Sequence, residues 1–247
     1  MPDLTLSGAR NPEIGKIPEE ELARILVAHS LWLSSEGTAG AQFDRPGVNL
    51  IYGGFLQANL QQVNLPGACL LHANLRDCDL TGANLAAADL EGASMVNAIL
   101  TGAMLAGAKL DKAILPGAHF ENADLSRARL CATNLLSVNF IRTQLCGADL
   151  TDANLAGAVV RDSQLDDADL TDAKLMLVNF SGSSLRRAGL ARAVLFGAIF
   201  DGTDLANADL SSALGLTAAQ LSTAFGNRGT RLPAALADVV LQEKPLD

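Results

Sequence analysis

The chain has few of the residues that build most enzyme sites and most globular cores. Only 4% of its 247 residues are aromatic, with one Trp and one Tyr. This scarcity suits a thin rod better than a globule, because large aromatic side chains fill much of an ordinary core. The three histidines, His29, His72 and His119, lie in separate parts of the chain, and no GxSxG, HExxH or Gly-rich phosphate loop is present. The sequence therefore predicts a protein that is not an enzyme, with no catalytic, cofactor or metal site.

Paired cysteines, long apolar runs and a basic amino terminus are also missing. The four cysteines are scattered and form no CxxC pair, so neither a zinc site nor a disulfide framework is expected. No apolar stretch is long enough to cross a bilayer. The first residues lack the basic region and the apolar run of a secretory signal. These absences predict a cytoplasmic protein that makes no membrane contact.

A strict five-residue repeat occupies the middle of the chain. Every fifth residue from Leu50 to Leu210 is large and apolar: of 33 such positions, 26 are Leu, five are Phe, and the others are Met95 and Val160. The residue two places earlier is small, and it is Ala at 22 of the 33 positions. A period of five fits neither an α-helix nor a single β-strand, which repeat every 3.6 and every two residues or so.

Four repeats make one 20-residue coil with four similar sides. Each side places its large residue and its small residue inward, and the interior demands a small residue because it is narrow and densely packed. The other three residues face outward. Gly follows the large residue by two places at 11 positions, where tight corners often need a positive φ angle.

The motif Ala-(Asp/Asn)-Leu recurs through the repeat, as at Ala58-Asn59-Leu60, Ala88-Asp89-Leu90 and Ala208-Asp209-Leu210. With this motif, about two thirds of the chain resembles the pentapeptide-repeat proteins. The resemblance implies an all-β solenoid, a right-handed quadrilateral β-helix. About eight coils at a strand spacing of about 4.8 Å would make a rod roughly 40 Å long. Residues 20 apart would then stack, which predicts one interior column containing Phe120, Phe140, Val160, Phe180 and Phe200.

The repeat and its flanks predict three parts. Residues 1–47 form an amino-terminal helical cap and lead-in, residues 48–213 form the β-helix, and residues 214–247 form a carboxy-terminal helical cap. The amino-terminal helix is expected from Pro18, which suits the first helical position, to Ser34. It resembles a leader found before the repeats in some bacterial family members. We interpret it as a plug over the first coil rather than a recognition helix, because an open coil end is a row of unpaired backbone groups.

The carboxy-terminal part begins where the period decays, at Gly215. Thr217 and Gln220 predict a capping box and a short helix that Gly226 ends. Pro233 predicts the start of a second helix, whose small apolar face is formed by Leu236, Val239 and Val240. This face either joins two chains into a homodimer or folds back onto the last coil, and the sequence leaves both alternatives open.

Charged residues can be compared by column, because residues 20 apart should be neighbours on adjacent coils. Opposite charges then meet in pairs that contribute tenths of a kcal/mol each and fix the register. The predicted pairs are Arg129–Asp149, Arg142–Asp162, Asp166–Arg186, Asp167–Arg187 and Asp172–Arg192.

One acidic cluster is not explained by such pairs. Its members lie on one side of two successive coils, and they are Asp149, Asp152, Asp169 and Asp172. Carboxylates this close destabilise a fold, so the cluster is a candidate docking patch for a basic partner surface. The alternative is a solvated acidic face. A calcium site is the least favoured interpretation, because rigid side walls rarely supply about six oxygens.

Two functions fit these patterns. The first is a non-catalytic rod that binds or scaffolds another protein, because a regular rod without loop insertions offers no deep cleft. The alternative, implied by the resemblance to quinolone-resistance members of the family, is a DNA mimic that modulates a type II topoisomerase, gyrase or topoisomerase IV. About 40 Å of duplex carries about 23 charges, whereas residues 48–213 hold 17 acids and 11 bases, a net charge of −6. Direct nucleic-acid binding is not expected, because no basic stripe exists.

Overall fold

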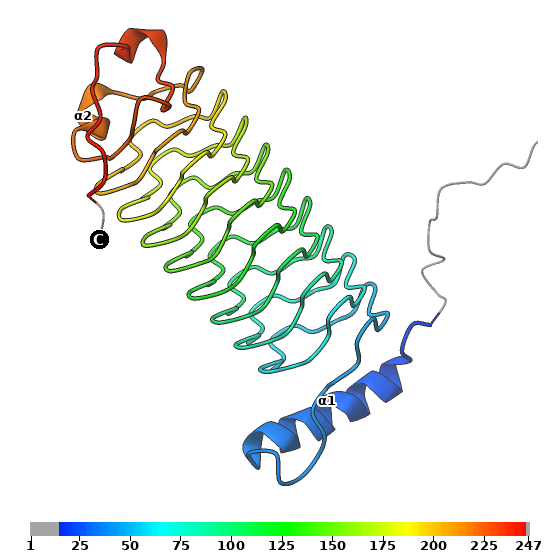
Figure 1. Cartoon of the computed structure of the whole chain (residues 1–247). Helices are drawn as coiled ribbons and strands as arrows, with labels where there is room; N and C mark the ends of the chain where they lie inside the picture. Colours follow the sequence, from blue (N-terminus) through cyan, green and yellow to red (C-terminus); the bar gives the residue numbers. More distant parts are fainter. Residues whose placement is uncertain (1–14, 246–247) are drawn as a thin grey trace, which may run out of the picture.

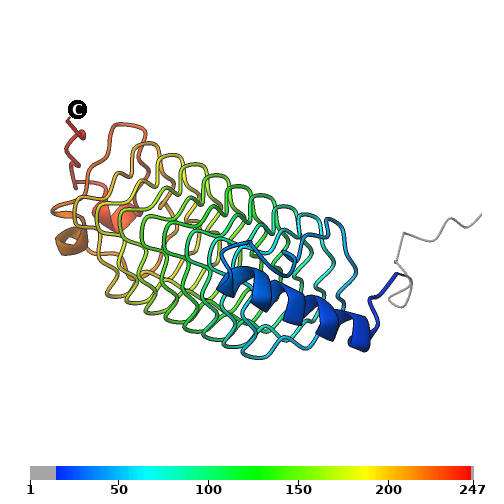
Figure 2. The same cartoon turned by 90° about the horizontal axis from the view of Figure 1, so that it is seen from below.

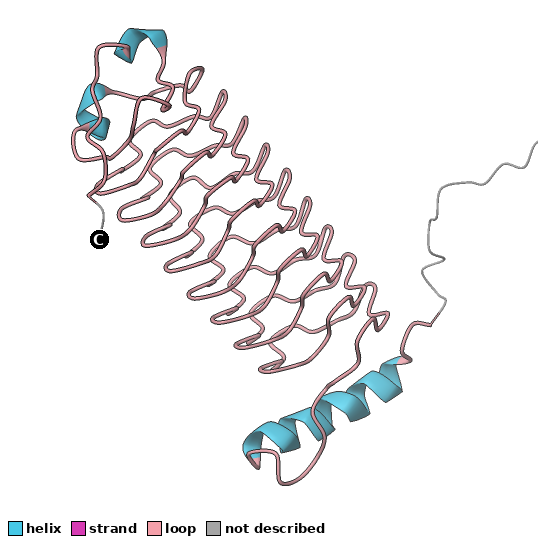
Figure 3. Ribbon diagram, viewed as in Figure 1, coloured by secondary structure: helices cyan, strands magenta, loops and turns pink. Residues whose placement is uncertain are grey.

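The middle of the chain winds into a four-sided rod, with each 20-residue coil stacked on the one before it (Figure 1). The computed structural model describes residues 15–245. The residue that precedes each large inward residue pairs in parallel with the residue 20 positions later, from Asn49 with Cys69 to Val194 with Leu214. Each side contributes one such residue per coil, so the described residues contain isolated bridges and no continuous strand (Figure 3).

Every corner of the rod is a tight turn with the same backbone geometry. The amide of the small residue donates to the carbonyl of the preceding large residue, as from Ala88 to Leu85 at 3.0 Å. Ser163 is an exception, because its amide donates to Ser183 Oγ at 3.0 Å. The residue two places after the large one has a positive φ at all 32 corners from Tyr52 to Asn207, and 21 of these residues are not Gly. The positive φ expected of the 11 corner glycines is confirmed, and the stacked coils also hold larger residues in this conformation.

The Asp or Asn of the repeated motif caps the corner that follows it. Its side-chain oxygen accepts the amide two residues later: Asn84 Oδ1 accepts from Ala86 at 3.2 Å, and Asp149 Oδ1 accepts from Thr151 at 3.0 Å. Asp and Asn side chains favour such contacts with their own turns. Many outward carboxylates of this rod therefore serve the backbone.

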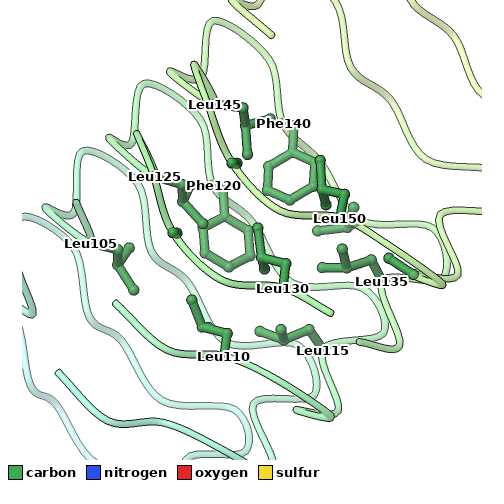
Figure 4. Close-up of a cluster of buried hydrophobic side chains, with 14 of the residues drawn as sticks. Leu105, Leu110, Leu115, Phe120, Leu125, Leu130, Leu135, Phe140, Leu145 and Leu150 are labelled. Atoms are coloured by element: carbon green, nitrogen blue, oxygen red, sulfur yellow. The ribbon is translucent and has the colours of Figure 1, made fainter. Parts of the chain in front are cut away.

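The interior is a narrow column of Leu and Phe (Figure 4). The ring centroids of Phe120 and Phe140 lie 5.0 Å apart, and those of Phe180 and Phe200 lie 5.5 Å apart. Val160 is fully buried as well. The predicted aromatic column is confirmed, and its role is packing.

Beside the phenyl rings runs a ladder of buried hydroxyls. Each takes the small-residue position and donates to a carbonyl 23 residues earlier, as Thr143 Oγ1 does to Phe120 O at 2.7 Å and Thr203 Oγ1 does to Phe180 O at 2.9 Å. Because each hydroxyl has a partner, polar residues can replace Ala inside the rod. The ladder consists of Thr143, Ser163, Ser183 and Thr203.

Helix α1, Glu19–Ser34, lies across the first coil (Figure 2). Pro18 is the residue before the helix and not its first residue, so the predicted start was one residue early. Leu22 and Ile25 pack against the core. Buried His29 accepts the amide of Phe43 at Nδ1 (3.1 Å), which leaves Nε2 to donate to the carbonyl of Gln61 (3.0 Å). Of the helices in residues 15–245, none is long and apolar enough to span a membrane.

The carboxy-terminal segment continues the rod before it ends. Helix α2, Ala218–Leu221, begins with the predicted capping box of Thr217 and Gln220. It ends at Leu221 and not at Gly226, because the chain returns to pair Phe225 with Asp204 on the last regular coil. The predicted second helix is only the 3-10 turn η1, Ala234–Leu236. These segments give partners to backbone groups that a bare coil end would leave open.

Candidate functional site

The four aspartates of the acidic cluster lie on two successive coils of the rod. Asp149 and Asp169 are bridge partners on successive coils. Both cap corners, since Asp169 Oδ1 accepts the amide of Thr171 at 2.9 Å, as Asp149 does for its own turn. Asp172 bonds Arg192, with 2.7 Å between Oδ1 and Nε, and these hydrogen bonds lower the pKa of its carboxyl.

Three of the four acids in the cluster thus have partners within the rod, and Asp152 completes the cluster. The described residues contain no group of three or more His, Cys, Asp or Glu arranged to hold a metal ion. The cluster as a docking patch stays a prediction.

Two of the five predicted ion pairs form, Asp167–Arg187 and Asp172–Arg192. The other three were wrong, because each arginine bonds a different neighbour within reach. The contacts made instead join Arg129 to Asp111 (3.0 Å), Arg142 to Asn122 (3.0 Å) and Arg186 to Asp204 (3.2 Å). Asp111 and Asp204 are both buried, where an opposite charge is least screened by water.

One edge of the rod carries apolar side chains instead of charges. This edge is formed by the corners at residues 136–137, 156–157, 176–177 and 196–197, which stack on successive coils. It also includes the outward residues on the two sides that meet at these corners. Seven large apolar side chains are between 40% and 69% exposed there. We call them the apolar edge: Ile114, Leu136, Met176, Leu177, Phe196, Ile199 and Leu214.

Two exposed side chains of the apolar edge pack against glycines, where no Cβ atom blocks them. A Cβ on Gly215 would lie 2.6 Å from the Phe196 ring, and one on Gly197 would lie 2.7 Å from Leu177 Cδ2. Phe196 and Leu177 therefore lie along the rod, each over the glycine of the next coil. A shallow groove passes over Gly157, between Leu136 and Leu177.

Leu177 is strained as well as exposed. Its φ is 59°, and it is the only Leu, Ile, Val, Met or Phe among the 21 non-Gly corner residues with positive φ. The left-handed conformation costs such a residue about 1 kcal/mol. The same corner on other coils holds Asn97 and Gly157, which adopt this conformation more easily.

The two sides that meet at the apolar edge are nearly free of charge. Residues 113–120, 133–140, 153–160, 173–180 and 193–200 contain only His119 and Lys174 as ionisable groups. The diagonally opposite corner, at residues 126–127, 146–147, 166–167, 186–187 and 206–207, forms what we call the charged edge. The two sides beside it, residues 123–130, 143–150, 163–170, 183–190 and 203–210, contain eleven charged residues.

Sequence reasoning missed the apolar edge because it compared columns for charge alone. The signal was present, since Leu136, Ala156, Met176, Phe196 and Leu216 recur at intervals of 20 residues. Apolar residues in an outward column are the pattern that finds such a surface.

The three residues of the candidate dimer contact differ in their exposure. Leu236 and Val239 are partly buried against the core of their own chain, whereas Val240 is 89% exposed. Folding back therefore accounts for the first two residues. A dimer contact at this face stays a prediction that depends on Val240.

A comparison with protein families agrees with the architecture. The family model of pentapeptide repeats matches this chain in eight copies, and the matched ranges together cover residues 47–224. The comparison with curated proteins gave no match.

Several solved structures are similar to the chain. HetL, a pentapeptide repeat protein involved in heterocyst differentiation regulation from the cyanobacterium Nostoc sp. strain PCC 7120, is 32% identical over 75% of this chain and 91% of its own, with a TM-score of 0.44. The pentapeptide repeat protein alr5209 from Nostoc PCC 7120 is 32% identical over 49% of this chain and 84% of its own, with a TM-score of 0.37. QnrB1, a plasmid-mediated fluoroquinolone resistance protein, is 18% identical over 68% of this chain and 89% of its own, with a TM-score of 0.40.

The family match covers most of the chain, and pentapeptide-repeat proteins fold as right-handed quadrilateral β-helices. Parallel bridges 20 residues apart along four sides are the pattern that such a fold requires. The predicted fold class is confirmed to this extent. The chain belongs to the pentapeptide-repeat family.

Proposed function

We propose that this chain is a non-catalytic rod that binds a protein partner through its apolar edge. The observation that carries the proposal is the row of exposed apolar side chains between two nearly uncharged sides. Exposed apolar patches on soluble proteins commonly mark interaction surfaces, and covering them gains about 25 cal/mol per Å². A cytoplasmic location is part of the proposal.

Stability alone does not account for Leu177. Its side chain is 69% exposed and its backbone is strained, so the rod gains little from it. Asn or Gly would fit this corner with less strain, as Asn97 and Gly157 do. A residue that costs stability in the free rod is consistent with a role in binding.

The test is affinity capture from the native cell lysate, with three baits compared by mass spectrometry. The first bait is the natural chain, and the second carries Leu177→Asn and Phe196→Ser. The control bait carries Arg187→Ser and Asn207→Ser, two exposed changes on the charged edge. We expect the second bait to lose a partner that the control retains, with all three baits equally folded by circular dichroism. Identical partners on all baits would contradict the apolar edge as the binding surface.

A DNA-mimicking modulator of gyrase or topoisomerase IV is the second candidate function. The observation that favours it is the placement of Asp149 and Asp169 as neighbours, with Asp152 and Asp172 on the adjoining corner. It is the weaker candidate, because corner amides and Arg192 occupy three of these carboxylates. A supercoiling assay with purified gyrase tests it: protection from a quinolone that disappears when all four Asp are changed to Asn would favour the mimic.

A further inference from the structure

We propose that the partner clasps the apolar edge in a concave apolar groove and so contacts both sides of the rod that meet there. This inference rests on the proposed function and states the shape and chemistry of the partner. The edge is a convex ridge between two flat sides, and each side adds apolar groups to it. Val194 and Leu214 lie on one side, and Val159 and Ile199 lie on the other.

The size of a side decides between a clasp and a flat contact. Three extended residues at about 3.3 Å each make a side roughly 10 Å wide, and six coil levels from Ile114 to Leu214 at about 4.8 Å span roughly 29 Å. One side therefore offers roughly 300 Å², whereas a stable interface covers about 800 Å² on each partner. Both sides together offer roughly twice the area of one, so a partner must reach around the edge to approach a stable interface.

A second copy of this chain does not supply that shape. The rod formed by residues 44–214 has four sides joined by tight corners, as its stacked coils show in two views along its length (Figures 1 and 2). Two such rods would meet over a single side, with the area of one side on each copy. The same magnitude that favours a clasp therefore argues against a symmetric rod pair.

The chemistry of the groove follows from the edge. Lys174 is the one permanent charge on these two sides. Their outward Asn side chains each accept a corner amide within the rod, and they are Asn134, Asn139, Asn154 and Asn179. The groove lining is therefore uncharged and mostly apolar, with no more than one acidic or carbonyl group to meet Lys174. Phe196 is 58% exposed and aromatic, which is the type of side chain that most often anchors an interface. We infer a pocket for Phe196 within the groove, with aliphatic walls on either side.

The experiment is photo-crosslinking of the full chain inside its native cells. Benzoylphenylalanine is placed singly at Val194 on one side, at Ile199 on the other side, and at Arg187 on the charged edge as the control. We expect the same partner to be captured at positions 194 and 199 and not at 187. The crosslinked peptides should be apolar and should come from two walls of the partner. Leu177→Asn should lower capture at both positions together, by roughly tenfold.

Salt dependence supplies a second readout. Between about 50 and 300 mM salt, capture at positions 194 and 199 in lysate should change less than about twofold, because screening acts on charges and not on apolar contacts. A partner held by the acidic cluster would be lost over the same range.

The outcomes separate this inference from the proposed function. Capture from one side only would overturn the clasp and leave flat docking. A product with twice the mass of the chain, alone, would overturn it in favour of a second copy. Capture at position 187 alone would move protein binding to the charged edge, and no capture at any position, together with no partner in the affinity experiment, would reject protein binding itself.

Discussion

The two opposite edges of this rod share one backbone and one core, and they differ in the side chains that they show to water. On the charged edge, Asp167 bonds Arg187 through two hydrogen bonds, and Arg186 bonds buried Asp204. On the apolar edge, Phe196 remains 58% exposed. The charged edge is thus largely satisfied within the rod, whereas the apolar edge has surface left for a partner. A dense array of charges is weaker evidence for binding than a short row of uncovered apolar groups.

The two edges share one core, and the largest change in stability is expected from a substitution in that core. Phe140→Ala should lower the free energy of unfolding by about 3–5 kcal/mol, because it leaves a cavity beneath both edges. Phe196→Ala is the matched control on the apolar edge, and it should change stability by no more than about 0.5 kcal/mol. Urea unfolding followed by circular dichroism measures both. A similar loss for the two variants would show that Phe196 belongs to the core.

A smaller effect is expected where the charged edge meets the interior. Asp204→Ala should lower stability by about 1–3 kcal/mol, because its carboxylate accepts the buried amide of Ala206 at 3.0 Å and bonds Arg186. Asp167→Ala removes an exposed partner of Arg187 and should have a much smaller effect. The same unfolding experiment measures the difference. If the two variants were equal, burial would not be what distinguishes these carboxylates.

The apolar edge should respond in the opposite direction. Leu177→Asn should leave stability unchanged or raise it by up to about 1 kcal/mol, because Asn accepts the left-handed conformation more readily. Ser137→Asn, at the same corner two coils earlier, is the control and should be nearly neutral. Thermal melts measure both variants. A large loss of stability for Leu177→Asn would mean that Leu177 serves the fold and not a partner.

The amino-terminal cap lies outside both edges, and its pH response should be the smallest effect. Burial lowers the pKa of His29 from 6.5, and the bond to the Gln61 carbonyl opposes this only partly. The unfolded cap therefore binds a proton more readily than the folded one. The contribution of His29 to stability is complete above pH 6.5 and is lost as the pH falls below that value.

The single tryptophan makes this response measurable. Trp32 stacks on His29, with ring centroids 5.8 Å apart. Its fluorescence should change as the pH falls from 7 to about 5, together with faster exchange of the Phe43 amide, which donates to His29. His29→Gln should remove this pH dependence. An unchanged profile in that variant would assign the effect to another group.

The sequence predicted the interior and missed much of the surface. A period of five that stacks every 20 residues fixes which side chains meet inside, so the aromatic column could be read directly. The ion-pair partners of Arg129 and Arg186 could not be predicted from the repeat. A long arginine side chain reaches several neighbours and pairs with a buried carboxylate among them. The end of the rod was missed for a related reason: the bridges of Asp204 and Asp209 shift to spacings of 21 and 22 residues, which a fixed period does not reveal.

By itself, the sequence determined the family, the coil and the direction of each side chain, because those follow from a period that the chain repeats without interruption. The tertiary structure decided how far each outward side chain is exposed to solvent. Ile51 and Cys69 take outward positions and are nevertheless buried, whereas Phe196 takes an equivalent position and remains open to water. Direction depends on the local backbone, but exposure depends on which neighbouring coils and end segments come to lie over a residue, and only the assembled fold specifies those contacts.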